Sequence, residues 1–381
     1  MENKIKNFRI NVLDGFRAIA ILIVLLFHYF SRWTLLYPYS DKYDFFRYGK
    51  MGVQFFFIIS GFVILYSLEN TTNFIAFWKK RMIRLFPSIL VASIITYFVF
   101  VLFDTELLFP ASHFFKNILA SIIFIPPDTL ASIFNNKVQL DYISGSYWSL
   151  WPEIQFYLFV STIYFFNKNK FLITFFILSA MLIIINFILP GMEGILANRI
   201  KSFFIVFNFI ESLPYFCFGV LFYIAYKNKM MEKAIPAYLQ ISFLGLLLFQ
   251  IYGSYSEPLK LGLIFLFLFL FIALIYYPKL INFLENRILV KIGVSSYFLY
   301  LIHENIGVLT INKYSGFFTN YEFLFSLILI FIFVIVSIAY TSTIDNWINR
   351  LLKKIFLKKM NELEMQKLEM YKLLNAQQHF L

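Results

Sequence analysis

The sequence has little charge, since only 14% of its 381 residues are Asp, Glu, Lys or Arg, whereas soluble domains carry about 25%. With 60% hydrophobic residues, the chain has too few polar side chains to cover a surface in water, which excludes a soluble globular protein. It has a single cysteine, Cys217, which excludes an intramolecular disulfide and a cysteine-based metal site. We interpret Cys217 as a small core residue. The sequence also lacks a glycine-rich phosphate loop, zinc-ligand spacing and a GxSxG motif.

Long apolar runs are abundant. Spanning a membrane takes roughly 17 to 25 mostly apolar residues in a helix, which satisfies its own backbone hydrogen bonds in lipid. The sequence therefore predicts an all-α polytopic membrane protein with about ten transmembrane helices, near 12–35, 51–68, 84–103, 147–166, 171–189, 202–226, 237–253, 260–277, 293–312 and 322–344. A shorter apolar stretch, 114–125, precedes two prolines and predicts a re-entrant or interfacial helix rather than a span.

The formal net charge of +12 has a topological explanation. Most Lys and Arg residues fall in segments that lie inside if the N-terminus is inside, so the positive-inside rule predicts that both termini are cytoplasmic. We therefore expect no nucleic-acid partner. We expect the first apolar stretch, from Ala18 to Phe30, to be retained as a span, because no small-residue cleavage site follows it.

The chain divides into an expected transmembrane domain, 1–345, and a cytoplasmic tail, 346–381. The tail has apolar residues at helical spacing with lysines between them, which predicts a basic amphipathic helix. Such a helix either lies on the anionic inner leaflet or binds a partner, and the sequence leaves both open.

Four ionisable residues lie within predicted spans, where each costs on the order of 3 kcal/mol at the helix centre and is a functional candidate: Arg17, His28, Glu153 and His303. Arg17 and His28 are about 16 Å apart along the helix and only about 20° apart around it, so they share a face. Glu153 is predicted at nearly the depth of His28, so a carboxylate could orient the imidazole as a base. The structural alternatives are a hydrogen bond between helices for His28 and snorkelling for Arg17.

His303 is ambiguous. It lies near Tyr297 and Tyr300 in the ninth predicted span, and a hydrogen-bonded core histidine is as good an interpretation as a ligand group. Its neighbour Glu304 lies about 100° further around the helix and could belong to the same polar patch.

Two further patterns each allow a structural and a functional interpretation. Lys79, Lys80, Arg81 and Arg84 precede the third predicted span, either as a positive-inside signal or as an anion site in which two guanidinium groups bind a polyphosphate. In the second span, glycines at 52 and 61 flank Ser60. They indicate close helix packing or a path for an acyl-carrying chain.

Together with their neighbours, these residues resemble the motifs of a known family. Five segments, in order, resemble motifs of the acyltransferase 3 family of membrane O-acyltransferases: LDGFRA at 13–18 followed by His28, GVQFFFIISGF at 52–62, RMIRLFP at 81–87, WSLWPEIQFY at 148–157 and IGVSSY at 292–297 followed by YLIH at 300–303. The departures are few: Phe16 replaces a leucine, and Ile154 replaces an often acidic residue, which leaves Glu153 as the acid there. The esterase-like domain of some members is absent, so we expect the stand-alone form.

The resemblance implies transfer of an acyl group, most often acetyl, from cytoplasmic acetyl-CoA or another acyl-CoA to a sugar hydroxyl of a cell-envelope glycan at the inner membrane, without a metal. The residues that the motifs and the spans assign to the site are His28 and Glu153 as catalytic groups, Arg17, Arg81 and Arg84 for acyl-CoA, and Asp14, Ser60, Trp148, Tyr297 and His303 as supporting groups. Direct transfer and a covalent intermediate on His28 or Ser60 both remain open. A secondary transporter or glycan flippase is the main alternative function, and a non-enzymatic scaffold is another.

Overall fold

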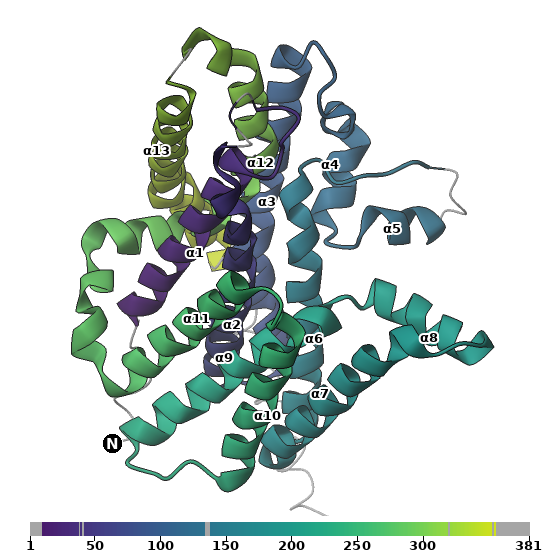
Figure 1. Cartoon of the computed structure of the whole chain (residues 1–381), viewed down its shortest axis with the longest axis vertical. Helices are drawn as coiled ribbons and strands as arrows, with labels where there is room; N and C mark the ends of the chain where they lie inside the picture. The colour runs from purple at the N-terminus through teal and green to yellow at the C-terminus, as the bar shows by residue number, and fades with distance from the viewer. Residues whose placement is uncertain are drawn as a thin grey trace, which may run out of the picture.

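The computed structural model describes residues 10–37, 39, 42–133, 138–318, 321–352 and 354–355, and every regular element in these ranges is helical (Figure 1). The expected all-α architecture is confirmed. The helices are α1 (Asn11–Phe30), α2 (Met51–Glu69), α3 (Phe74–Phe103), α4 (Phe115–Ile122), α5 (Pro127–Ile133), α6 (Leu150–Phe166), α7 (Phe171–Ile188), α8 (Ile195–Val206), α9 (Phe209–Met230), α10 (Ala237–Ser254), α11 (Pro258–Tyr276), α12 (Arg287–Tyr314) and α13 (Glu322–Tyr340).

Eight helical segments in the described part of the chain are long and apolar enough to cross a membrane. They correspond to α1, α2, α3, α7, α9, α10, α11 and α13, and the chain is a multi-pass membrane protein. Each of the ten predicted spans overlaps a helix, but two of those helices fall outside the eight: α6 has only 17 residues, and α12 carries many polar residues. Buried polar side chains on α12 include His303, Glu304 and Asn305, which suit a helix surrounded by protein rather than lipid.

Helices α1, α2, α9 and α12 form the centre of the bundle, where α1 packs against α12 and α2, and α2 packs against α9. The glycines at 52 and 61 permit this. A Cβ at Gly52 would collide with backbone of α1, and one at Gly61 would collide with the carbonyl of Phe216 on α9. The close-packing interpretation of these glycines is therefore confirmed.

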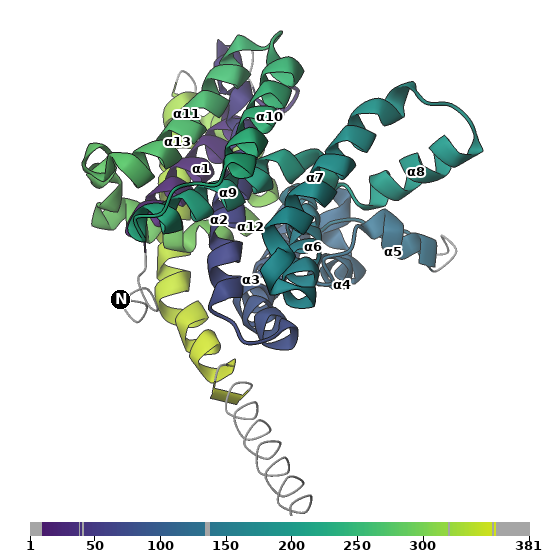
Figure 2. The same ribbon diagram turned by 90° about the horizontal axis from the view of Figure 1, so that it is seen from below.

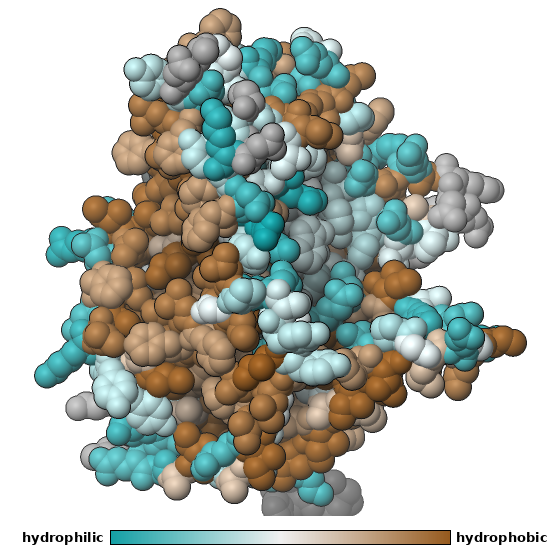
Figure 3. Space-filling view, viewed as in Figure 1, coloured by the Kyte–Doolittle hydropathy of each residue, from teal (hydrophilic) through white to brown (hydrophobic). Residues whose placement is uncertain are grey.

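The periphery is apolar. Helices α7 and α8 project away from the centre of the bundle (Figure 2), and α7 and α10 are largely exposed. A broad apolar surface covers the region of α9, α10 and α11 in Figure 3. Such a surface is expected where lipid takes the place of water.

Several expected boundaries were wrong. The first span ends at Phe30 rather than at 35, and α3 begins at Phe74, ten residues before the expected start, so the basic cluster lies within this helix rather than before it. The expected span 202–226 is two helices, α8 and α9, with a break at 207–208. The short helix predicted at 114–125 is present as α4.

At its C-terminal end, α13 continues through a π-helical turn, Thr341–Asp345, into a helical segment that reaches 352. The helix therefore runs across the expected domain boundary at 345/346. Most of the predicted amphipathic tail, beyond 355, lies outside the described residues.

Candidate active site

A cavity of about 370 Å³ opens among helix ends that the positive-inside rule places on the cytoplasmic side. The first turns of α1, the end of α2, the early part of α3, the start of α12 and the π-helical turn all contribute to it. Its polar lining residues are Asp14, Arg17, Tyr66, Arg84, Ser88, Ser296, Tyr297, Thr341, Asp345 and Asn346.

A second, narrower cavity of about 80 Å³ continues deeper into the bundle. Arg17, Arg84 and Tyr297 line both cavities, so the two are neighbours along one route. The deeper cavity adds Arg81, Glu153 and Tyr300, together with Ser60, Ser149 and Tyr157. Three guanidinium groups thus surround one route from the predicted cytoplasmic side into the membrane domain.

The three arginines are held differently. Arg17 donates through Nη1 to Asp14 Oδ1 at 2.8 Å, one turn earlier on α1. Arg81 is buried, with its guanidinium carbon 5.4 Å from the ring centre of Phe77, and its Nε has no hydrogen-bond partner among the described residues. Arg84, one turn further along α3, is exposed. Because guanidinium groups pair well with phosphates, the group can bind a polyanion.

Glu153 lines the deeper cavity, and its hydrogen bonds are to Ser60 and Tyr157 rather than to His28. Ser60 Oγ donates to Glu153 Oε1 at 2.7 Å, and the Tyr157 hydroxyl donates to the same oxygen. No described contact joins Glu153 to His28, so the expected pairing of these two residues was wrong. Similar depth was the only basis for that pairing, and depth says nothing about which neighbour a helix face meets.

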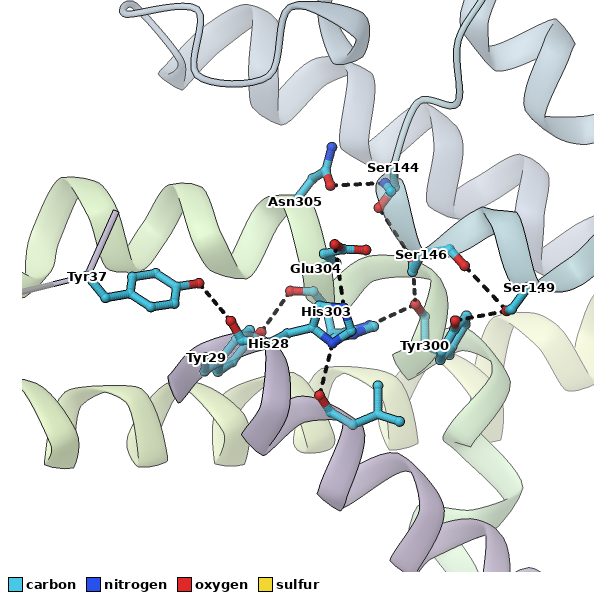
Figure 4. A network of polar contacts seen from close by, with 12 residues as sticks. His28, Tyr29, Tyr37, Ser144, Ser146, Ser149, Tyr300, His303, Glu304 and Asn305 are labelled. Carbon is cyan, nitrogen blue, oxygen red and sulfur yellow. Dashed lines mark hydrogen bonds and ion pairs between the residues drawn. The ribbon is translucent and has the colours of Figure 1, made fainter. Parts of the chain in front are cut away.

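Glu304 on α12 takes the place expected for Glu153. His28 Nε2 lies 3.4 Å from Glu304 Oε1, and His28 Nδ1 lies 3.2 Å from Nε2 of His303 (Figure 4). All three side chains are buried. The sequence signal for Glu304 was its position beside His303, but only the packing of α1 against α12 shows that it faces His28.

The backbone determines the tautomers of both histidines. Because a carbonyl can only accept, His28 Nδ1 must donate to Val24 O at 2.9 Å, and His303 Nδ1 must donate to Tyr300 O at 2.8 Å. In neutral His28 this leaves Nε2 without a proton and facing the Glu304 carboxylate. A proton taken up at Nε2 would form an ion pair with Glu304, so a hydroxyl that reaches this nitrogen beside Glu304 can lose its proton to it.

The turn Gly145–Ser149 anchors α12 beside this cluster (Figure 4). Ser149 Oγ donates to the Tyr300 hydroxyl at 2.8 Å, and Ser146 Oγ donates to the Tyr300 carbonyl at 3.2 Å. Tyr300 lines the deeper cavity and its carbonyl orients His303, so it links the arginine-lined route to the histidines.

Two supporting residues from the sequence analysis have different outcomes. Tyr297 lines both cavities and donates its hydroxyl to Leu85 O at 3.2 Å. Trp148 is 46% exposed and lines neither cavity, which fits the belt position at a membrane interface typical of tryptophan. Within the described ranges, no group of three or more His, Cys, Asp or Glu side chains could hold a metal ion.

Comparisons with known proteins agree on one kind of protein. A family model described as an acyltransferase domain matches residues 10–342. An O-acetyl transferase of Shigella phage Sf6 is 28% identical over 258 residues, which cover 65% of this chain and 71% of the phage protein. The O-acetyltransferase OatA of Staphylococcus aureus is 25% identical over 335 residues, 79% of this chain and 51% of OatA, so the match spans about half the length of that relative. No solved structure matches the chain significantly.

Proposed function

Since this chain belongs to the acyltransferase 3 family, whose model covers residues 10–342, we propose that it is a membrane O-acyltransferase. The donor is a cytoplasmic acyl-CoA, with acetyl-CoA the simplest choice given the names of its relatives. The acceptor is a sugar hydroxyl of a cell-envelope glycan. The protein acts in the inner membrane, and the reaction needs no metal.

The observation that carries this proposal is the arginine-lined route that leads towards a histidine pair. Arg17 and Arg84 line both of its cavities, and Arg81 lines the deeper one. The phosphates of CoA would bind these guanidinium groups. The pantetheine arm would extend past Tyr297 towards Tyr300, which places the thioester on the side of His303 and His28.

The chemistry needs a base because a sugar hydroxyl is a poor nucleophile at neutral pH. We assign this role to His28: its Nε2 takes the hydroxyl proton as the oxygen attacks the thioester carbonyl. A bond forms between the sugar oxygen and the acyl carbon, the carbon–sulfur bond breaks, and the proton passes to the CoA thiolate. Glu304 stabilises the imidazolium in between, and His303 orients the ring.

Glu153 and Ser60 have a different role in this proposal. The Ser60 hydroxyl donates to Glu153 rather than contacting either histidine, and both residues line the deeper cavity near Arg81. We propose that the Glu153 carboxylate balances the positive charge of Arg81 and helps to shape the donor route. Since the Ser60 hydroxyl contacts neither histidine, we propose direct transfer to the sugar and no acyl-Ser60 intermediate.

The test uses purified protein in nanodiscs with radiolabelled acetyl-CoA and envelope polysaccharide that mild alkali has stripped of esters. We expect label in the polysaccharide with the wild type and none with His28→Ala. Mass spectrometry of envelope glycans from cells with and without the protein then identifies the acyl group and the acceptor. Equal glycan masses together with no labelled polysaccharide would reject the enzyme and favour the alternative, a transporter or flippase that uses the same buried charges.

A further inference from the structure

We propose that a third cavity, on the opposite side of the histidine pair from the arginines, is the subsite that binds the sugar of the acceptor. This inference rests on the proposed function and adds residues to it. The cavity has a volume of about 550 Å³, within the usual range of ligand sites. It lies among the turn after α1, the segment 109–117 and the segment 139–145, all on the side predicted to face outward.

The floor of this cavity lies beside the carboxylate partner of the proposed base. Gly145 and Asn305 both line it, and Asn305 follows Glu304 on α12. A Cβ on Gly145 would lie 3.0 Å from both carboxylate oxygens of Glu304, so this glycine, which lines the cavity, lies directly against that carboxylate. Glu304 in turn contacts His28. A sugar bound at the floor would therefore lie beside Glu304, the partner of the base, on the side away from the donor route.

The walls suit a carbohydrate. Aromatic rings of Trp33, Phe109, Phe114 and Tyr142 line the cavity, and aromatic faces attract the C–H groups of a sugar ring. Polar side chains between them, Lys116, Gln139 and Asp141, can donate to and accept from sugar hydroxyls.

The cavity is also preorganised. Asn305 Nδ2 donates to Ser112 Oγ at 3.0 Å, and its Oδ1 accepts from the Gly145 N–H at 3.1 Å. Asn117 donates to Ala111 O at 2.8 Å and accepts from the Asp141 N–H at 3.1 Å. These two buried amides join the segments that form the walls, so a ligand would not have to order them on binding.

Because the chain has a single cysteine, the substitution Cys217→Ala gives a cysteine-free background for a labelling experiment. In that background Lys116→Cys places a thiol at the cavity, and Phe115→Cys places one on the adjacent residue of the same helix, which is exposed but does not line the cavity. The alkali-treated envelope polysaccharide should slow maleimide labelling of the first thiol at least fivefold and leave the second unchanged. Equal labelling rates with and without polysaccharide at position 116 would overturn the proposal.

A second measurement uses transfer itself. After maleimide modification, the Lys116→Cys protein should show at least a tenfold higher KM for polysaccharide and an unchanged KM for acetyl-CoA. The modified Phe115→Cys protein should behave as before modification. Equal KM values for polysaccharide in both proteins would contradict the subsite. If the wild type transfers no acetyl group, the proposed reaction fails, whereas the protection experiment still decides whether the cavity binds the glycan.

Discussion

Two carboxylates within the helical bundle, Glu153 and Glu304, have different neighbours and should respond differently to neutralisation. Glu304 contacts His28, whereas Glu153 contacts Ser60 and Tyr157. A carboxylate that stabilises an imidazolium matters in the transition state, and one that shapes the donor route matters mainly for binding. The same chemical change therefore separates their roles.

We predict that His28→Ala lowers kcat by about 10² to 10⁴, the usual contribution of a positioned base, and that Glu304→Gln lowers kcat by a smaller factor. Neither change should weaken acetyl-CoA binding. Glu153→Gln should raise the KM for acetyl-CoA more than it lowers kcat. Single-turnover transfer and donor binding, measured on the same detergent-purified variants, check this. A wild-type kcat in Glu304→Gln would show that a group other than Glu304 stabilises the imidazolium of His28.

A second residue-scale prediction concerns the arginines. Arg81→Ala and Arg84→Ala should raise the KM for acetyl-CoA more than they lower kcat, because phosphates bound there are remote from the thioester. Removing the buried Arg81 should have the larger effect, since charge-assisted bonds are stronger where water is excluded. The control is Lys79→Ala on the same helix, which lines neither cavity. An unchanged KM in both arginine variants would leave the cluster as a topology signal only.

Among the elements, the contact between α2 and α9 positions one wall of the donor route. We predict that Gly61→Ala destabilises the protein by about 1–3 kcal/mol, the usual cost of overpacking, because its Cβ would collide with the Phe216 carbonyl. Gly262→Ala on α11 is the matched control, because a Cβ there meets nothing within 4 Å. Thermal unfolding of detergent-purified protein measures both. Equal melting temperatures for the two variants would show that the helices separate at little cost.

A second element-scale prediction concerns the segment that follows α3 and carries Phe109 into the third cavity. Asp104 accepts from the N–H groups of Leu108 and Phe109, and His113 Nε2 lies 2.9 Å from its Oδ2. Burial raises the pKa of Asp104, but the bonds from His113 and from the two backbone groups outweigh it, so the pKa lies below its ordinary value of 3.8.

The stabilisation by Asp104 is therefore complete above about pH 4 and is lost as the pH falls through its lowered pKa. We predict that hydrogen exchange of residues 104–113 is equally slow from pH 5 to 8, after correction for intrinsic exchange rates, and accelerates only in stronger acid. Asp104→Asn should accelerate it throughout, because an amide nitrogen cannot accept the Phe109 N–H. Exchange in α2 serves as the control. Slow exchange in Asp104→Asn would show that this carboxylate does not order the segment.

For the whole molecule, the arrangement of the three cavities predicts that the donor and the acceptor bind from opposite sides of the membrane. The arginine-lined cavities lie at helix ends predicted to face the cytoplasm, and the third cavity lies beyond the histidines. In proteoliposomes, acetyl-CoA on one side and polysaccharide on the other should give labelled polysaccharide. Removing acetyl-CoA from the cytoplasmic side and supplying it only with the polysaccharide should abolish labelling. Transfer with both substrates confined to the outer side would contradict this arrangement.

The sequence determined the class of the protein and much of its inventory. Composition and long apolar runs require helices in a membrane, because lipid offers the backbone no hydrogen-bond partners. The cost of burying a charge identified Arg17, His28, Glu153 and His303 as exceptional. The ordered motifs pointed to the family that the match over 10–342 shows. Each of these inferences needs only the local sequence and the properties of the bilayer.

The tertiary structure decided which of these residues meet. Helical periodicity gives the face and approximate depth of a side chain, but the neighbour of that face depends on how helices distant in sequence pack. For this reason Glu153 lies with Ser60, and Glu304, 276 residues after His28, lies against the imidazole. The third cavity has the same origin: Trp33, Asn117 and Asn305 line one space only because α12 packs against α1 and its Asn305 bonds to Ser112 and Gly145. Long-range packing, which no local pattern encodes, therefore determines the partner of the base and the place for an acceptor.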